Sequence, residues 1–165
     1  MMRARLRCYW LALLLLGVPA LHAAELRPFV SGSLQQIVAA HHGTPFILGL
    51  WSRSCSHCRE ELTMLGQLVA DHPQAAVVLI STDSIDESAA VAATLQGYGL
   101  GAVESWVFAD PYLERLQYEI DNRWYGELPR TYLYAGNGTR SGHSGRLDRS
   151  WLQGWLDQQE ARRRE

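Results

Sequence analysis

The segment PFILGLW, from Pro45 to Trp51, is a continuous apolar run with no polar alternation. Such a run is typical of a strand that is buried on both faces, as in parallel sheets covered by helices. A second run, AVVLIST from Ala76 to Thr82, has the same character. Between the two, Leu62, Leu65 and Leu68 recur at helical spacing. The order strand, helix, strand predicts an α/β fold.

The rest of the chain continues this alternation of helices and strands. The expected elements are a helix capped by Ser33 that ends near Gly43, an alanine-rich helix from Asp86 to the glycines after Gln96, a strand over Ser105–Asp110, a helix through Leu113 and Leu116, a hairpin turning at Asn137-Gly138, and a final helix capped by Asp148. Together they predict a central mixed β-sheet flanked by helices on both faces.

The N-terminus resembles an export signal. Three arginines precede an apolar run from Trp10 to Leu16, and small residues follow between Ala20 and Ala24. This pattern is typical of a secretory signal peptide, and the run is shorter than the roughly 20 residues of a membrane helix. We therefore predict a signal over residues 1–24 and one domain over residues 25–165, in the periplasm. The alternative is an uncleaved signal that anchors the domain to the inner membrane.

Charge argues against one class of partner. The signal holds three of the 15 basic residues and none of the 17 acidic ones, so residues 25–165 have 12 basic and 17 acidic side chains, a net charge of −5. Nucleic acid is an unfavourable partner for such a chain, because its phosphates attract a basic surface.

The cysteines allow three interpretations. Cys8 lies within the predicted signal, which leaves Cys55 and Cys58 in the stretch SRSCSHC. A bridge across two intervening residues restricts the unfolded chain very little, so a purely structural disulfide is a weak interpretation. A zinc or copper site needs further ligands, and the histidines are scattered without a paired spacing: His41, His42, His57, His72 and His143. A redox pair is the third interpretation.

The position of the pair favours redox chemistry. The cysteines follow a buried strand and lie where a helix begins, with Cys55 at the expected helix start. A helix N-terminus stabilises an anion, and the thiolate is the reactive form in disulfide exchange. Side chains three residues apart on a helix are about 5–6 Å apart, so the thiol of Cys58 can reach that of Cys55.

The stretch LGLWSRSCSHCREEL resembles the active site of the thioredoxin superfamily, in particular the TlpA/ResA-type extracytoplasmic thiol–disulfide oxidoreductases. These proteins have a strand, the motif W-x-x-x-C-x-x-C, a helix, and later a cis-proline before a hairpin. Pro129 in GELPRTYLY stands at the place of that proline, and Thr131 matches a threonine common in the family. The resemblance extends from about Ser33 to Leu156 and implies a thioredoxin-like fold.

The resemblance also implies roles for individual residues. Cys55 would attack a substrate disulfide, and the better buried Cys58 would resolve the mixed disulfide, with a Cys55–Cys58 disulfide as the oxidised state. Leu128 and Pro129 would line the groove that binds the extended substrate, and Trp51 would pack beside the disulfide at the substrate-binding site.

Three further positions affect the expected proton transfer and reduction potential. Glu61 matches an acidic position of the TlpA/ResA branch and could accept the proton of Cys58 if burial raises its pKa; the alternative is a glutamate that only favours the helix dipole. Protonated His57 would stabilise the Cys55 thiolate and raise the reduction potential; the alternative is a solvent-facing histidine of little effect. Gly49 stands where thioredoxin has a buried aspartate, so proton transfer by that route is absent.

The resemblance implies an enzyme without a cofactor that reduces the disulfides of exported client proteins, for example in cytochrome c maturation. A membrane thiol-electron transporter of the DsbD/CcdA kind would supply the electrons, and the domain would be a monomer. The main alternative is a DsbA-like dithiol oxidase, against which the lack of a segment long enough for a large helical insertion argues. A metal-binding module is a weaker alternative, because relatives that deliver copper usually have a C-x-x-x-C spacing.

Overall fold

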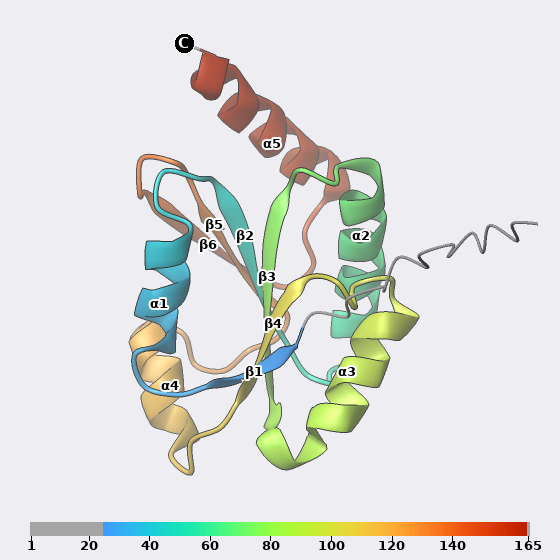
Figure 1. The fold of residues 1–165 in the computed structure, drawn as a ribbon, viewed down its shortest axis with the longest axis vertical. Coiled ribbons are helices and arrows are strands. Elements are labelled where there is room, and N and C mark those ends of the chain that lie inside the picture. Colours follow the sequence, from blue (N-terminus) through green and yellow to red (C-terminus); the bar gives the residue numbers. More distant parts are fainter. Residues whose placement is uncertain (1–24, 165) are drawn as a thin grey trace, which may run out of the picture.

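The computed structural model describes residues 25–164, which form one six-stranded mixed sheet with helices on both faces (Figure 1). The strand order is β1-β4-β3-β2-β5-β6. The strands are β1 (Leu26–Phe29), β2 (Phe46–Trp51), β3 (Ala76–Ser84), β4 (Glu104–Phe108), β5 (Arg130–Tyr134) and β6 (Arg140–Ser144). The predicted mixed sheet is confirmed.

Five α-helices and one 3₁₀ helix connect these strands. They are α1 (Ser33–Ala40), α2 (Cys58–Asp71), the 3₁₀ helix η1 (Ile85–Glu87), α3 (Ser88–Gly97), α4 (Leu113–Ile120) and α5 (Arg149–Arg164). Helices α2, α3 and α5 supply buried residues on one face of the sheet, and α1 and α4 supply them on the other. The second half of α5 extends beyond the end of the sheet (Figure 1).

The pairing of the strands brings several chain segments to one end of the sheet, where the strands β2, β3 and β4 terminate. Strands β2, β3 and β4 are parallel to one another, whereas β5 is antiparallel to β2. The carboxyl ends of β2, β3 and β4 therefore lie at the same edge as the amino end of β5 (Figure 1). Ser52, which follows the last residue of β2, and Pro129, which precedes the first residue of β5, therefore lie at this end of the sheet.

Strand β2 is buried along its whole length, as its apolar sequence predicts. Because side chains alternate along a strand, Ile47 and Trp51 pack in the cluster with α2 and α3, while Phe46, Leu48 and Leu50 pack in the cluster with α1 and α4. The sheet thus separates two hydrophobic cores, which accounts for the absence of polar alternation in this segment.

Two local features differ from the sequence prediction. Strand β1, whose segment LRPF contains a proline, was not predicted; it pairs in parallel with β4 at the edge of the sheet. Ser33 does not cap α1: it is the first helical residue, and its hydroxyl oxygen accepts a hydrogen bond from the N–H of Val30.

The predicted signal at residues 1–24 lies outside the described residues. Between residues 25 and 164, each helix is too short or too polar to cross a bilayer.

Candidate active site

Cys55 and Cys58 form a disulfide with their Cα atoms 5.3 Å apart, at the sheet edge where β2 ends. The helix begins at Cys58 and not at Cys55, which lies in the turn before it. The backbone N–H of Cys58 points at the Sγ atom of Cys55, 3.1 Å away. The sulfur of Cys55 therefore lies at the N-terminus of α2, where unpaired N–H groups stabilise negative charge.

The two cysteines differ in exposure. Cys58 is fully buried, whereas Cys55 is partly exposed. This difference is compatible with the predicted roles, in which Cys55 attacks and Cys58 resolves, and those roles stay predictions.

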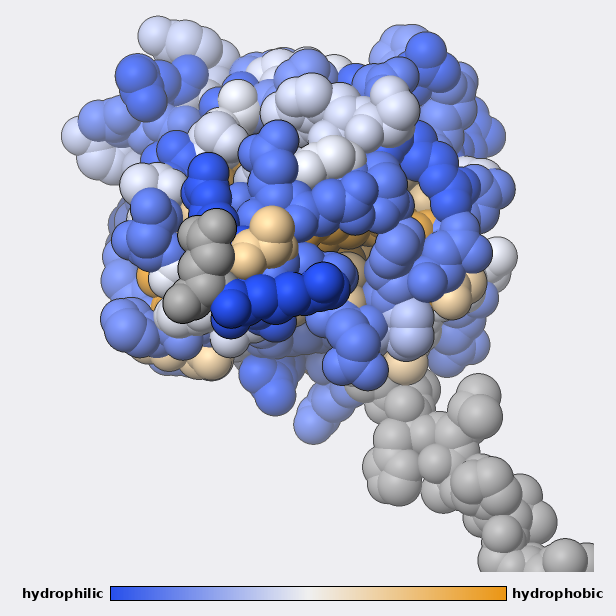
Figure 2. All heavy atoms as spheres, turned by 90° about the horizontal axis from the view of Figure 1, so that it is seen from above, coloured by the Kyte–Doolittle hydropathy of each residue, from blue (hydrophilic) through white to orange (hydrophobic). Residues whose placement is uncertain are grey.

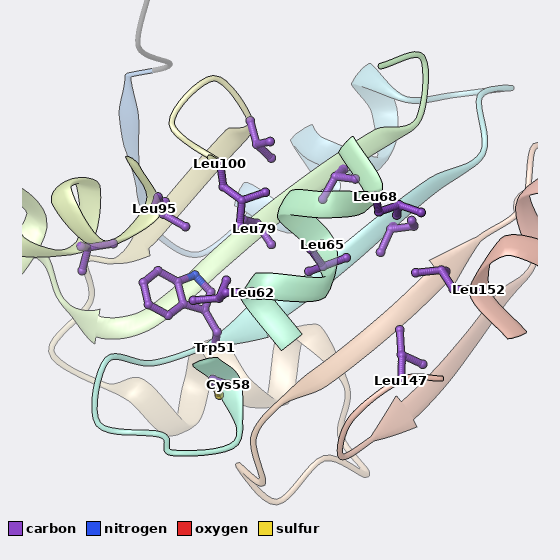
Figure 3. Close-up of a cluster of buried hydrophobic side chains, with 14 of the residues drawn as sticks. Trp51, Cys58, Leu62, Leu65, Leu68, Leu79, Leu95, Leu100, Leu147 and Leu152 are labelled. Atoms are coloured by element: carbon purple, nitrogen blue, oxygen red, sulfur yellow. The ribbon is translucent and has the colours of Figure 1, made fainter. Parts of the chain in front are cut away.

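Trp51 supports the disulfide from within the protein. It is 2% exposed and packs in the same cluster as Cys58 and Leu62 (Figure 3). Cys55 and Leu128 pack against this cluster from its partly exposed side. Trp51 and Cys58 thus belong to one buried cluster, and the predicted packing of Trp51 directly beside the disulfide stays a prediction. Direct contact of its indole with a substrate stays a prediction.

The turn that leads to Cys55 is fixed by its own hydrogen bonds. The backbone N–H of Cys55 donates to the carbonyl of Ser52 over 3.2 Å. The hydroxyls of Ser52 and Ser54 are 2.7 Å apart, and the N–H of Ser54 also donates to the Ser52 hydroxyl. Arg53 attaches the turn to the next strand, because its N–H donates to Asp83 Oδ2 over 3.0 Å.

Glu61 lies one turn into α2 and is buried, with 4% of its surface exposed. Its Oε1 accepts a hydrogen bond from the Thr131 hydroxyl at 3.2 Å, and its Oε2 accepts one from the N–H of Leu147 at 3.0 Å. Burial raises the pKa of Glu61 above its usual 4.5, although these two bonds and the charges of His143 and Arg146 act in the opposite direction. The pKa therefore shifts in the direction that the predicted role of proton acceptor needs.

The carboxylate of Glu61 is bonded to the strand residue that pairs with Gly49. In the sheet, Gly49 of β2 lies beside Thr131 of β5, which in turn lies beside His143 of β6. A Cβ at Gly49 would lie 3.0 Å from the side chain of Leu79, so this position is filled by the packing of its neighbours. The carboxylate bonded to this row comes from the helix, because the Thr131 hydroxyl donates to Glu61.

Leu128 and Pro129 immediately precede β5 and are joined by a cis peptide bond, as predicted for this proline. Pro129 is buried and Leu128 is partly exposed. Since Leu128 packs against the cluster that also contacts Cys55, the structure brings this dipeptide and the disulfide to one site. Their contact with a client chain stays a prediction.

The loop before Pro129 is closed by an ion pair that the sequence did not reveal. Asp121, just after α4, lies 3.3 Å from the guanidinium of Arg130, the residue after Pro129. Asp121 also accepts hydrogen bonds from the N–H of Arg123 at 3.0 Å and from the hydroxyl of Tyr132 at 3.1 Å. The two ends of the segment that presents Leu128 and Pro129 are thus bonded to each other.

The groups around Asp121 keep its carboxyl group ionised. Burial by itself raises the pKa of Asp121. The bonds from Arg123 and Tyr132, with the charges of Arg140 and Arg123, more than offset that effect, so the pKa lies below its usual 3.8. Burial also raises the pKa of Tyr132 to about 12, which keeps its hydroxyl protonated and able to donate. No signal in the sequence joins these residues, because they meet only through the loop and the strand.

His57 precedes α2 directly, with φ −74° and ψ −23°, and its side chain is exposed. Its predicted effect on the Cys55 thiolate remains a prediction. Within residues 25–164 there is no group of three or more histidine, cysteine, aspartate or glutamate side chains arranged to hold a metal ion.

Comparisons with known proteins identify the fold. No protein-family model matches the sequence, and no curated protein is significantly similar to it in sequence. Many solved structures do match in three dimensions.

DsbF of Mycobacterium tuberculosis aligns with a TM-score of 0.59 at 18% identity, over 73% of this chain and 84% of that chain. A secreted disulfide oxidoreductase of the same organism, homologous to DsbE of E. coli, aligns with a TM-score of 0.57 at 22% identity, over 70% of this chain and 82% of that chain. A putative thioredoxin from Neisseria meningitidis aligns with a TM-score of 0.58 at 17% identity, over 74% of this chain and 79% of that chain. These similarities confirm the predicted thioredoxin-like fold.

Proposed function

We propose that this protein is an extracytoplasmic thiol–disulfide oxidoreductase that reduces disulfides of exported client proteins. The observation that carries the proposal is the arrangement of the cysteine pair: a partly exposed Cys55, whose sulfur receives the first N–H of α2, and a fully buried Cys58. The structural neighbours include proteins described as thiol–disulfide interchange proteins, which supports the same chemistry.

The reaction proceeds in two exchange steps. The Cys55 thiolate attacks one sulfur of the client disulfide, forms a mixed disulfide, and releases the other client sulfur as a thiolate that takes up a proton. Cys58 then loses its proton and attacks Cys55 Sγ, which releases the second client sulfur. Two electrons pass to the client, and the protein is left with the Cys55–Cys58 disulfide.

Glu61 is suited to receive the proton of Cys58 in the second step. The two residues are three apart on α2, a spacing that brings side chains to about 5–6 Å. A buried carboxylate with a raised pKa is a better proton acceptor than an exposed one at neutral pH. A membrane thiol-electron transporter would return the protein to its reduced state, and cytochrome c maturation is one pathway that needs such a reductase.

Turnover of insulin with dithiothreitol as the electron source tests the proposal. We expect the wild-type protein to accelerate insulin reduction and the Cys55→Ser variant to lose this activity, since the nucleophile is removed. Full activity in Cys55→Ser would contradict the proposal. A reduction potential measured against glutathione distinguishes the reductase from the DsbA-like oxidase, because an oxidase has a potential near −120 mV and a reductase one nearer −270 mV.

A further inference from the structure

Exposed apolar side chains gather at the edge of the sheet where β3 and β4 end. Ile85, Tyr112 and Leu113 are 37%, 64% and 42% exposed. They lie where β3 passes into η1 and where β4 leads into α4, at the same end of the sheet as the disulfide (Figure 1). The opposite end, seen in Figure 2, is covered mostly by hydrophilic side chains. The mechanism described above makes no use of this apolar surface.

Two of these side chains, Ile85 and Leu113, line a hollow of about 410 Å³. Ile85 forms one wall, Pro111 and Leu113 form the other, and Phe108, which is 1% exposed, lies at its floor. A leucine-sized side chain entering the hollow would thus be covered on several sides by apolar groups, and burying such a group is favourable.

Arg53 connects the hollow to the active-site turn. Its backbone N–H bonds to Asp83 and its guanidinium bonds to Glu87 Oε1 at 2.6 Å. Asp83 and Glu87 lie on either side of Ile85 in the chain, and Arg53 is two residues before Cys55. Strand β3 lies between β2 and β4, so the hollow is about two strand spacings, roughly 10 Å, from the turn. An extended chain covers that distance in about three residues.

The rim of the hollow is acidic. Asp110 is part of its lining, and Asp86 and Glu87 are exposed on η1 beside it. A hydrogen bond from the N–H of Tyr112, together with Arg115, lowers the pKa of Asp110, which is therefore charged at neutral pH. Arg53 pairs with Glu87 and Arg115 pairs with Asp110, so these three carboxylates and two guanidinium groups leave the rim one negative charge. A client segment with an acidic side chain at this point is therefore weakly repelled, whereas an apolar one is accepted.

We propose that the hollow between Ile85 and Leu113 binds an apolar side chain of the client, about three residues from the client cysteine that reacts with Cys55. The occupant is the extended client chain itself, because the hollow lies at the same end of the sheet as the turn at which the mixed disulfide forms, and Arg53 bonds that turn to the residues on either side of Ile85. This inference rests on the proposed function and adds a substrate preference to it: apolar residues near the cysteine are favoured over polar ones, and acidic residues are disfavoured.

Peptide disulfides test the preference. Each substrate is a disulfide-linked dimer of one short peptide, with leucine, serine or glutamate three residues before or three residues after the cysteine. The full-length protein, reduced beforehand, reacts with each in a single turnover. We expect the leucine peptide in the favoured orientation to react about fivefold faster than the serine peptide, a factor that corresponds to burying roughly half a leucine side chain. The glutamate peptide should be slower than the serine peptide.

Variants of Ile85 and Leu113, the exposed residues in the walls of the hollow, test whether the hollow causes the preference for leucine. In Ile85→Ser and Leu113→Ser, the leucine-to-serine ratio should fall to less than twofold. Val38→Ser is the matched control, since Val38 is as exposed as Ile85 but lies on α1, outside the hollow; it should keep the wild-type ratio. Hydroxyethyl disulfide, which has no peptide, should be reduced at the same rate by all four proteins. A wild-type protein without preference, or a preference that both wall variants retain, would overturn the proposal.

A binding measurement separates failure of this proposal from failure of the proposed function. Peptides in which serine replaces the cysteine cannot exchange disulfides, and their affinity can be measured by fluorescence anisotropy. Tighter binding of the leucine peptide by wild type but not by Leu113→Ser supports the hollow even if hydroxyethyl disulfide is not reduced, a result that would refute only the redox function. Equal affinities for the leucine and serine peptides would refute the hollow as a binding site.

Discussion

The Oε2 atom of Glu61 accepts a hydrogen bond from the backbone N–H of Leu147 at 3.0 Å, which joins the first turns of α2 to the segment between β6 and α5. The neighbouring residue Glu60 forms an ion pair with Arg146 in the same segment. One of these carboxylates is buried and the other exposed. Their substitution should therefore have different consequences for stability.

We expect Glu61→Gln to stabilise the oxidised protein at pH 8 and to have little effect at pH 4. The folded-state pKa of Glu61 is raised, so its contribution to stability is fully present below its usual pKa of 4.5 and is lost as pH rises through the folded-state pKa. Glutamine carries no charge to bury, and it can accept from Leu147 while donating to Thr131. Urea unfolding of the oxidised proteins at both pH values measures the difference in unfolding free energy.

Glu60→Gln is the control for this effect. It loses only an exposed ion pair with Arg146, so it should change stability by at most about 1 kcal/mol and should not stabilise the protein at pH 8. If Glu61→Gln were less stable than wild type at pH 8 and equally stable at pH 4, burial would not be the dominant influence on the carboxyl group of Glu61.

Asp121→Asn should destabilise the protein by about 2–3 kcal/mol at pH 7, because Arg130 and Arg140 lose the carboxylate that they share, and Arg130 keeps only Glu127 at 3.6 Å. The pKa of Asp121 is depressed in the folded state, so its stabilising contribution is present above 3.8 and is lost as pH falls through the folded-state pKa. The difference in unfolding free energy between Asp121→Asn and wild type should thus become smaller at low pH. Urea unfolding at pH 7 and pH 3 tests this, with the exposed Asp157→Asn as control; a gap that widens at pH 3 would contradict it.

His57→Pro should lower the reduction potential by about 30 mV, which corresponds to about 1.4 kcal/mol for a two-electron couple. The substitution removes a group that, when protonated, favours the Cys55 thiolate, and the φ of −74° at this position is compatible with proline. Equilibration with glutathione at several pH values measures the potential, with His72→Ala, at the far end of α2, as control. A potential unchanged in His57→Pro would show that His57 has no influence on the couple.

Gly66→Ala in α2 should destabilise the protein, although alanine is the better helix former by about 1 kcal/mol. A Cβ at Gly66 would overlap the carbonyl oxygen of Tyr98, so α2 would have to move away from the segment after α3. Gly154→Ala in α5 is the matched control: a Cβ there meets no neighbour within 4 Å, and the substitution should stabilise the protein by up to about 1 kcal/mol. Thermal unfolding of both variants compares them; a more stable Gly66→Ala would contradict the close packing.

Much of the fold could be predicted because its strongest signals are local. The apolar run that forms β2, the leucine spacing of α2 and the turn at Asn137-Gly138 each report on neighbouring residues. Strand β1 was missed because its short segment contains Pro28 and half of its residues are exposed, and because it is fixed only by pairing with the distant β4.

The site could be predicted in part for the same reason. Cys55, Cys58 and Pro129 follow a recognisable spacing, whereas the bonds of Glu61 to Leu147 and of Asp121 to Arg130 form only when the chain folds back on itself. The start of α2 was placed three residues early, because the sequence does not show that the turn from Ser52 is held by its own hydrogen bonds.

The proposed exchange depends most directly on which sulfur reacts with the client. Intact-mass spectrometry of the reduced variants, mixed with a peptide disulfide, measures this, with Cys8→Ser in every protein so that only the pair can react. We predict that Cys58→Ser accumulates a stable mixed disulfide of one peptide on Cys55, because the resolving thiol is absent, and that Cys55→Ser forms none, since Cys58 is fully buried. An adduct on Cys58 in the Cys55→Ser protein, or none on Cys55 in the Cys58→Ser protein, would contradict the proposed exchange.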